Sequence, residues 1–286
     1  MDQFAVGLAI GVSYAMVLFL IAAGLSMTWG LMGIINLSHG TVFMVGGYVS
    51  LTVAELTDNF ILGLLAGTVA AGIVGLIIER TTISRLYKQF LDQILVTYGF
   101  VYIISNATLW VWGPHAKPPY VPELLSGAIS IGHLDFPVHR LAIIVSGLLL
   151  AGALWWLQER TKFGAIVRAG MDDAEMTGGL GINLRPVIII AFFFGSMVAG
   201  FGGAIGLPVL GGVYTWLGID ILWVAIIVCI VGGMGSIQGA LGGALIIGII
   251  DTFGKMYFPQ LAMFTSYLVA IVILLVRPRG LFGRKV

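Results

Sequence analysis

Residues 4–28 read FAVGLAIGVSYAMVLFLIAAGLSMT and contain no Asp, Glu, Lys or Arg. A helix of this length crosses the roughly 30 Å hydrocarbon core of a bilayer. Only Met1, Asp2 and Gln3 precede the run, so it lacks the basic start of a cleavable signal peptide, and we expect it to remain as a helix. The run predicts the first transmembrane span of this chain.

Comparable apolar runs continue along the whole sequence. Hydrophobic residues make up 59% of the 286 residues and charged residues only 9%, against about 25% charged in a soluble domain. The alternating short strands of an outer-membrane barrel are not seen. We therefore predict an all-α fold, a polytopic bundle of 8–9 spans in which residues 1–286 form a single transmembrane domain. The spans after the first are expected at 36–56, 61–79, 92–112, 139–158, 186–206, 219–234, 237–254 and 259–276.

Glycine is frequent, with 41 residues, or about 14% of the chain against a usual share of about 7%. Pairs spaced four apart, such as Gly7/Gly11 and Gly63/Gly67, indicate close helix packing in lipid. The single cysteine, Cys229, excludes an internal disulfide and is interpreted as a buried apolar filler. No cofactor or metal site is expected. His39 has no second His, Cys or paired carboxylate at metal-ligand spacing. His115, His133 and His139 lie in or beside the loop 113–138, where they could meet, but nothing in the sequence fixes them together.

The positions of Lys and Arg predict which side of the membrane each loop faces. Cytoplasmic loops are enriched in these residues, and eleven of the fourteen fall in three clusters. The clusters are Arg80, Arg85 and Lys88; Arg160, Lys162, Arg168 and Arg185; and Arg277, Arg279, Arg284 and Lys285. Placing them in the cytoplasm puts the N-terminus outside and the C-terminus inside, which requires an odd number of crossings. The short runs 219–234 and 237–254 either both cross or form a hairpin that does not.

Residues 113–138 form a long loop that this arrangement places outside. Its prolines stiffen the chain. A plain connector and a docking surface or external gate are both compatible with this composition.

A second long loop, residues 159–185, is expected in the cytoplasm and is amphipathic. Its apolar residues follow helical spacing and predict one helix at about 163–180. The apolar stripe is Phe163, Ile166, Val167, Gly170, Met171 and Ala174. The charged face is Lys162, Arg168, Asp172, Asp173 and Glu175. A helix with a mixed-charge face is less typical of the lipid headgroup layer than a basic one. The pattern alone favours structural bracing and docking to a soluble partner equally.

Few polar side chains fall within the spans, and two groups are candidates for a transport pathway. Asn36, Ser38 and His39 open the second span, where they would either line a watery route or satisfy the backbone of a helix break. Tyr98 and Asn106 are eight residues apart on the fourth span, close to one face. They would line the pathway or form hydrogen bonds between helices.

Three separated runs resemble the branched-chain amino-acid (LivHM-type) permeases of bacterial ATP-binding-cassette (ABC) importers. The run RAGMDDAEMTGGLGIN at 168–183 is similar to the coupling-loop signature of that family. The N-terminal half carries GLS at 24–26, GLMG at 30–33, INLSHG at 35–40 and GGY at 46–48, and the C-terminal half carries GGMGSIQGA at 232–240. Ser38 stands where many members have Ala.

The resemblance implies a type II importer-like permease that works by alternating access. The partners implied are a second, homologous permease subunit, usually as a heterodimer, two cytoplasmic ATPase subunits and a periplasmic or extracellular binding protein. In that family the loop helix sits in a cleft on the ATPase, and the matching coupling positions are Arg168, Asp173, Glu175 and Gly181. The implied location is the bacterial inner membrane.

Other functional classes fit the sequence less well. The GxxxxGK[ST] nucleotide motif does not occur, so the chain is not expected to be an enzyme and ATP hydrolysis is assigned to partners. An ion-coupled transporter normally keeps carboxylates within the membrane, whereas Glu79, Asp92, Asp220 and Asp251 fall near predicted span ends. No channel filter or HExxH or GxSxG site is found. The net charge of +1 argues against nucleic acid as a partner. Membrane lipid is expected to surround the spans. Branched-chain amino acids, other small amides and organic acids stay open as substrates.

Overall fold

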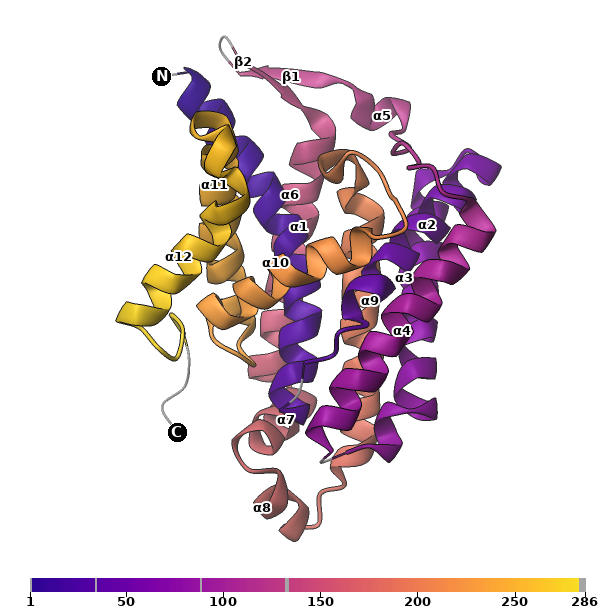
Figure 1. Cartoon of the computed structure of the whole chain (residues 1–286), viewed down its shortest axis with the longest axis vertical. Helices are drawn as coiled ribbons and strands as arrows, with labels where there is room; N and C mark the ends of the chain where they lie inside the picture. The colour runs from indigo at the N-terminus through magenta and orange to yellow at the C-terminus, as the bar shows by residue number, and fades with distance from the viewer. Residues whose placement is uncertain (1, 34, 88, 132–133, 283–286) are drawn as a thin grey trace.

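The computed structural model of the chain describes residues 2–33, 35–87, 89–131 and 134–282. Lys88, His133, Arg284 and Lys285, which the sequence analysis assigned to clusters or loops, lie outside these residues. The described chain is mainly helical (Figure 1).

Eight helices of the described residues are long and apolar enough to cross a membrane, which confirms the predicted polytopic helical bundle. They are α1 (Asp2–Met32), α2 (His39–Thr57), α3 (Phe60–Thr81), α4 (Phe90–Trp112), α6 (Val138–Arg160), α9 (Leu184–Leu210), α11 (Ile237–Tyr257), and α12 (Ala262–Val276) taken together with the turn before it, as Pro259–Val276. Two short 3-10 turns, η1 (Ile83–Arg85) and η2 (Pro259–Leu261), follow α3 and precede α12. Helices α1 and α9 extend beyond the predicted spans 4–28 and 186–206 at both ends.

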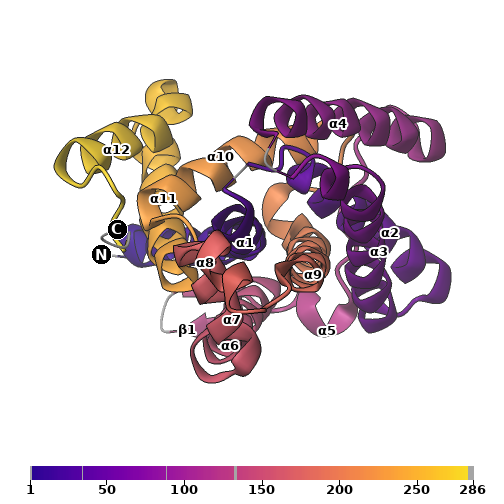
Figure 2. The same cartoon turned by 90° about the horizontal axis from the view of Figure 1, so that it is seen from below.

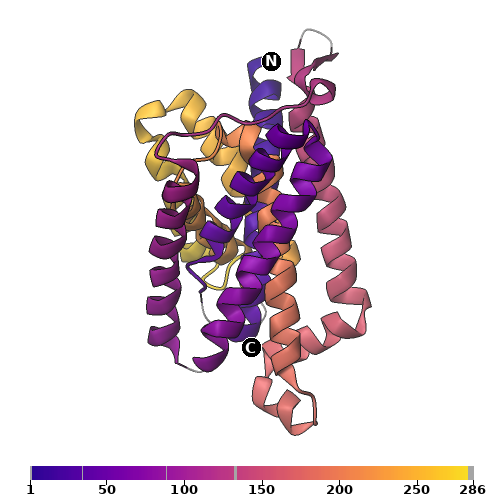
Figure 3. The same ribbon diagram turned by 90° about the vertical axis from the view of Figure 1, so that its right-hand side faces the viewer.

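The bundle has two ends of different character (Figures 1 and 3). One end, called the hairpin end below, carries α5 (Glu123–Ser126) and an antiparallel hairpin of β1 (Ala128–Ile131) and β2 (Leu134–Pro137), with Ala128 opposite Pro137. The opposite end carries two short helices, α7 (Lys162–Asp172) and α8 (Ala174–Gly179), and is called the α7–α8 end. The hairpin lies within the predicted loop 113–138, so this loop contains regular structure that the sequence analysis did not predict.

Two of the three basic clusters lie at one end of the bundle, and scattered basic residues lie at the other. The last turns of α3 and α6 and the start of α9, which carry the first two clusters, lie at the α7–α8 end (Figures 1 and 3). Lys117 precedes the hairpin and Arg140 lies in the first turn of α6, both at the hairpin end. The chain therefore separates the first two clusters from the scattered basic residues, as the charge pattern predicts. Which end faces the cytoplasm stays a prediction.

Glycines let α2, α3 and α9 approach closely at the centre of the bundle. A Cβ atom built on Gly46 of α2 would lie 2.5 Å from the Cα of Gly200 on α9, closer than real Cβ atoms come. A Cβ on Gly203 would overlap the carbonyl oxygen of Phe43, and one on Gly67 would overlap that of Gly46. Backbone therefore packs on backbone here, which supports the packing interpretation of the glycine pairs.

The return from α9 to α11 is not a regular span. Helix α10 (Leu217–Gly232) has 16 residues, about 24 Å at 1.5 Å per residue, and lies across the front of α1 in Figure 1. Before it, residues 211–216 are non-helical, and Val213 pairs with Lys117 at the hairpin end through N–H···O bonds of 2.8 and 3.0 Å. After it, the Gly235 carbonyl accepts a hydrogen bond from Gln158, in the last turns of α6. The non-helical segment and the oblique helix together connect the two ends.

Two predicted arrangements concerned this part of the chain, and the helix lengths bear on both. Helix α11 has 21 residues and is long and apolar enough to span. Helix α10 has 16 residues and is shorter than the eight candidate spans of the described residues. Whether α10 completes a crossing, and with it the odd number of crossings, stays a prediction.

Candidate functional site

The apolar stripe of the 159–185 segment forms α7 and packs against the bundle. The helix begins at Thr161, whose hydroxyl oxygen accepts a hydrogen bond from the Gly164 amide at 3.1 Å. Val167 and Gly170 are buried, and the half-buried members of the stripe pack on the same cluster. The cluster partners on α1 and α9 are Met27, Leu31, Val187, Ala191 and Ile188. Bracing against the membrane domain is therefore one role of this helix.

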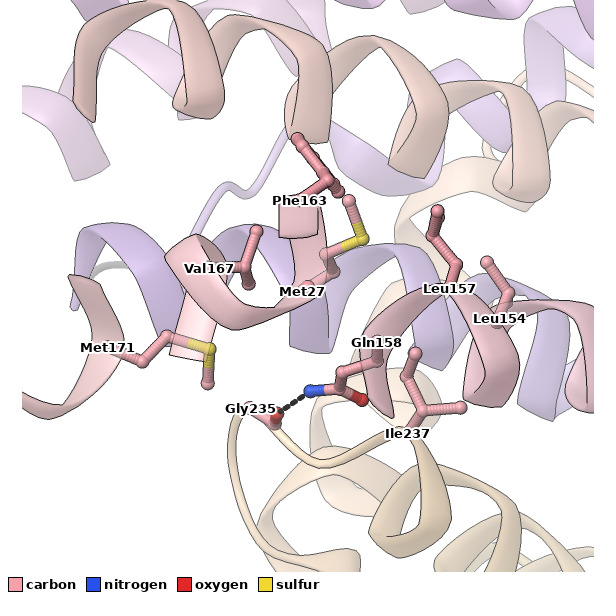
Figure 4. Close-up of a pocket in the computed structure, with 10 residues that line it drawn as sticks. Met27, Leu154, Leu157, Gln158, Phe163, Val167, Met171, Gly235 and Ile237 are labelled. Atoms are coloured by element: carbon pink, nitrogen blue, oxygen red, sulfur yellow. Dashed lines mark hydrogen bonds between the residues drawn. The ribbon is translucent and has the colours of Figure 1, made fainter. Parts of the chain in front are cut away.

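The contact between α7 and the bundle is tight (Figure 4). The cavity left at the joint has a volume of about 10 Å³, too small to hold more than about one water molecule. Met171 reaches the turn after α10, where a Cβ on Gly235 would overlap its terminal methyl group. Gln158 of α6 donates to the Gly235 carbonyl at 3.2 Å. Helix α7 is therefore packed directly against the ends of α1 and α6 and the turn at Gly235.

The predicted single helix at 163–180 is two helices. Asp173 has extended backbone angles, and its Oδ1 accepts a hydrogen bond from the Met176 amide at 2.8 Å. The Asp173 side chain thus caps α8 and competes with continuation of α7. Ala174, predicted to belong to the apolar stripe, is exposed because the chain turns at Asp173.

Helix α8 projects beyond the rest of the bundle (Figures 1 and 3). Met176 is 66% exposed and Leu180 is 76% exposed, and Glu175 is exposed beside them. Gly181 follows with a φ of +85°, a left-handed conformation that favours glycine. The sequence analysis missed Met176 and Leu180 as candidate contact residues; their i, i+4 spacing was the available signal.

Arg168 lies on α7 with 23% of its side chain exposed. Its Nη1 is 3.5 Å from Oε2 of Glu159, a distance longer than an ordinary hydrogen bond. Asp173 and Glu175 are exposed at the start of α8. The structure thus brings the four predicted coupling positions, Arg168, Asp173, Glu175 and Gly181, to one end of the molecule.

Asn36, Ser38 and His39 are buried together where α1 gives way to α2. Gly33 ends α1 with a φ of +67°, and the Asn36 Oδ1 accepts hydrogen bonds from the Ser38 amide at 3.1 Å and the Ser38 hydroxyl at 2.7 Å. His39 Nε2 lies 3.2 Å from the Ile21 carbonyl oxygen. Asn36 and Ser38 therefore satisfy the backbone of a helix break inside the bundle. A role in the pathway stays a prediction for all three.

Tyr98 and Asn106 lie on the outer face of α4, away from this break. Tyr98 is 37% exposed and its hydroxyl is 3.1 Å from that of Tyr102, whose ring makes an edge contact with Trp216 at 5.9 Å. Asn106 is exposed and donates to the Tyr102 carbonyl at 2.8 Å. Polar side chains on an exposed transmembrane face are costly in lipid and indicate a partner or a watery route. One predicted pathway group is thus buried at the helix break, and the other lies on the outer face of α4.

An open face lies between α4 and α12. These helices stand at the two ends of one side of the bundle with α10 between them (Figure 2), and most of their residues are exposed. The exposed side of α10 carries Asp220 and Trp223, and Trp216 is exposed directly before the helix. Tyr214 donates to Asp220 Oδ2 at 2.7 Å. Sequence reasoning missed this group because Asp220 was assigned to a span end.

A cavity of about 560 Å³ lies at the hairpin end between α1, α6, α9 and α11. It gathers Arg140, Asp251 and Lys255, which come from different parts of the sequence. The i, i+4 spacing of Asp251 and Lys255 was the one signal of this group in the sequence. Among the described residues, no three His, Cys, Asp or Glu side chains are placed to hold a metal ion.

Comparisons with known proteins agree on one family. The model of the family described as branched-chain amino acid transport system / permease component matches residues 7–276. The chain is 30% identical to the high-affinity branched-chain amino acid transport system permease protein BraD of Pseudomonas aeruginosa, over 99% of this chain and 96% of the relative. It is 29% identical to the corresponding LivH protein of Escherichia coli, over the same shares. It is 26% identical to the L-arabinose ABC transporter permease protein AraH of Azospirillum brasilense, over 85% of this chain and 70% of the relative.

The match to the family model covers nearly all of the chain, and it includes the helix break, the α7–α8 pair and the turn at Gly235. The eight apolar helices fit the same assignment. This multi-pass membrane protein therefore belongs to the family of permease components of the branched-chain amino acid transport system.

Proposed function

We propose that this chain is the permease subunit of an ATP-driven importer for branched-chain amino acids or similar small polar molecules. The observation that carries the proposal is the α7–α8 pair, one helix wedged against the bundle and the next projecting with exposed apolar side chains. Such an arrangement suits a lever between a soluble motor and a membrane domain. The substrate class follows from the names of the relatives at about 30% identity.

The motor is proposed to be a pair of cytoplasmic ATPase subunits. Met176 of α8 and Leu180, which directly follows α8, insert into a cleft on one of them, with Glu175 at the rim of the contact. Asp173 holds α8 at a fixed angle through its cap. Arg168, on α7, adds a charged contact to the ATPase subunit. Gly181 provides the turn that returns the chain to α9. Closure of the ATPase pair then pushes α7 against the turn at Gly235.

The orientation proposed from the charge pattern puts the α7–α8 end in the cytoplasm. The N-terminus and the hairpin end then face outward, where a substrate-binding protein docks. Lys117 and Val213 tie the proline-rich segment to the backbone that leads into α10. A docking protein that displaces this segment would therefore act on the oblique helix directly.

The pathway is proposed to lie between this chain and a second, homologous permease. The open face of α4, α10 and α12 supports this, since it places Tyr98, Asn106 and Asp220 where lipid would be unfavourable. Asn36, Ser38 and His39 lie inside the bundle behind this face, where their hydrogen bonds stabilise the helix break before α2.

Transport by the complete importer tests the proposal. The chain, its second permease and the ATPase subunits are reconstituted in liposomes, and accumulation of radiolabelled L-leucine is measured with and without ATP and binding protein. We expect accumulation that needs both. Uptake driven by an ion gradient without ATP would instead identify a secondary transporter.

A further inference from the structure

Another cavity, of about 380 Å³, lies on the side of the bundle and is lined by three helices. It runs along α6 from Ser146 to Leu157 and along α9 from Phe194 to Phe201, and Thr68 of α3 completes the wall. We call it the α6–α9 groove. In Figure 2, α6 lies on the side of the bundle away from α4 and α12, so the groove is separate from the open face.

The wall of the groove is apolar, and the two hydroxyl groups in it are already satisfied. Thr68 Oγ1 donates to the Leu64 carbonyl at 2.7 Å, and Ser146 Oγ donates to the Ile143 carbonyl at 3.0 Å. Both bonds stay within one helix. A buried water needs two to four polar partners, so an apolar cavity of this kind stays dry. The groove therefore suits a hydrocarbon chain and does not suit a polar solute.

The groove is open to the membrane and has the length of one leaflet. Leu149 is 70% exposed and Phe194 is 45% exposed, so a chain can enter from the side. From Ser146 to Leu157 the α6 axis rises about 16 Å at 1.5 Å per residue. This is about half of the roughly 30 Å hydrocarbon core. An acyl chain along the groove would reach from the membrane surface at the α7–α8 end to about the bilayer midplane.

Two helices of the groove lead to an exposed arginine at the α7–α8 end. On α6, Arg160 follows Leu157 by three residues, a spacing that places both on one side of the helix. On α3, Arg80 lies twelve residues after Thr68, about 18 Å along the axis. Arg160 makes only a long cation–π contact with Trp155, with its Cζ 6.0 Å from the ring centroid. Positive charge is thus present where the headgroup of a lipid in the groove would lie.

The acidic residues next to these arginines in the sequence have other partners. Glu79 is fully buried and accepts a hydrogen bond from the Tyr87 hydroxyl. Glu159 lies 3.5 Å from Arg168 on α7. Basic groups between transmembrane helices at a membrane surface attract anionic headgroups. Charge complementarity therefore favours an anionic phospholipid over a zwitterionic one.

We propose that the α6–α9 groove binds one anionic phospholipid from the leaflet at the α7–α8 end, with an acyl chain along α6 and the phosphate near Arg160 and Arg80. The lipid fills the space beside α6, the helix that leads directly into α7. A zwitterionic lipid makes the same apolar contacts without the favourable net charge. The inference is independent of the proposed function, because it requires only that the bundle spans a membrane.

Native mass spectrometry of the full-length chain tests the charge of the site. The chain is released from micelles that hold equal amounts of dioleoylphosphatidylglycerol and dioleoylphosphatidylcholine. We expect phosphatidylglycerol to be retained preferentially, and its ratio to phosphatidylcholine to fall about tenfold in the double variant Arg80→Gln/Arg160→Gln. Arg80→Lys/Arg160→Lys should keep the ratio. The control is Arg277→Gln, an exposed cation at the end of α12, which should not change it.

Filling the groove tests the position of the acyl chain. Ser146→Phe places a ring in the cavity and should remove the preferential retention of phosphatidylglycerol, and Thr68→Phe does the same from α3. Val145→Phe, half-exposed on α6 outside the groove lining, is the matched control and should retain the lipid. Thermal unfolding without added lipid shows which variants are folded. Phosphatidylglycerol should then raise the Tm of Val145→Phe and leave the Tm of the groove-filling variants unchanged.

Three outcomes would overturn the inference. The first is an unchanged lipid ratio in Arg80→Gln/Arg160→Gln. The second is equal retention of phosphatidylglycerol in Val145→Phe and in a folded groove-filling variant, which would describe unspecific lipid around the bundle. The third is displacement of the retained lipid by water-soluble glycerophosphate, which would identify a site for a free anion.

Discussion

Two roles compete for Arg168 at the residue scale, an ion pair with Glu159 within the chain and a contact with an ATPase subunit. We expect Arg168→Glu to abolish transport and substrate-stimulated ATP hydrolysis in the reconstituted importer, while the chain still inserts. Glu175→Lys should have the same effect, because both residues lie at the proposed motor contact.

Glu159→Gln separates the two roles, since it removes the partner at 3.5 Å and leaves Arg168 in place. A partly exposed pair of this length contributes about 1 kcal/mol or less, so transport should be nearly normal. Equal losses in Glu159→Gln and Arg168→Glu would show that Arg168 acts within the chain only.

Gly40 gives a second prediction at the residue scale. A Cβ at this position would overlap the Gly218 carbonyl oxygen and lie 2.8 Å from Leu222 Cβ, so α2 and α10 could no longer meet. We expect Gly40→Ala to lower stability by about 1–3 kcal/mol or more. The measurement is thermal unfolding of the purified chain in detergent.

The matched control is Gly99→Ala on α4, where a Cβ would have no heavy atom within 4 Å. Alanine is the better helix former by about 1 kcal/mol in water, so this variant should be neutral or slightly stabilised. A similar loss of stability in both variants would contradict the packing argument.

Single residues also show how far the sequence could predict the site. The polar run at Asn36–His39 was visible because polar side chains are rare in an apolar span. Arg140 was not recognisable as a neighbour of Asp251 and Lys255, because helices α7 to α10 separate it from them in the chain and only packing brings the three together. Sequence periodicity reports one helix at a time and says nothing about which helices meet.

At the element scale, Asp173 decides how the 162–179 segment is divided into α7 and α8. Removing its cap in Asp173→Ala should destabilise α8 by about 0.5–2 kcal/mol. We expect faster hydrogen–deuterium exchange at 174–179 and reduced coupling of ATP hydrolysis to transport. Exchange at 162–172 should not change, because Thr161 caps α7 independently.

Asp173→Ser keeps a capping oxygen and loses the charge. If Asp173 acts through the cap, this variant should transport nearly as well as the unmodified chain. Inactive Asp173→Ser with normal exchange at 174–179 would instead assign Asp173 a direct charged contact with the motor.

The break at Asp173 also explains an error of the sequence analysis. Apolar residues at helical spacing continue through Ala174, and the glycines at 178, 179 and 181 mark one end of the segment. An aspartate is tolerated within a helix or caps a new one, and its neighbours in sequence do not decide which. For α10 the apolar run was correctly found, but its length could not reveal that it lies across the bundle.

At the scale of the whole molecule, the orientation can be tested by surface labelling. We expect Tyr120→Cys to react with an impermeant thiol reagent in intact cells, and Lys162→Cys to react only after permeabilisation. The buried Cys229 provides the background in the unmodified chain. The reverse pattern would place the α7–α8 end outside and remove the proposed contact with cytoplasmic ATPases.

The overall architecture was largely predictable for a physical reason. Lipid forces backbone groups to be satisfied within each span, so hydropathy alone finds most helices. The exceptions are the break before α2 and residues 211–216, where irregular backbone is sheltered by protein. These exceptions depend on neighbours far away in sequence, such as Thr97, whose hydroxyl accepts the Leu37 amide at 3.3 Å.

The backbone contacts among α2, α3 and α9 have a genetic consequence. Every single-nucleotide missense change in a glycine codon specifies a residue with a Cβ atom. At Gly46, Gly200 and Gly203 that atom would overlap atoms of a neighbouring helix. A saturation scan of the gene should therefore place these codons among the least tolerant positions of the three helices. Read together, those points would trace the seams along which the three helices touch.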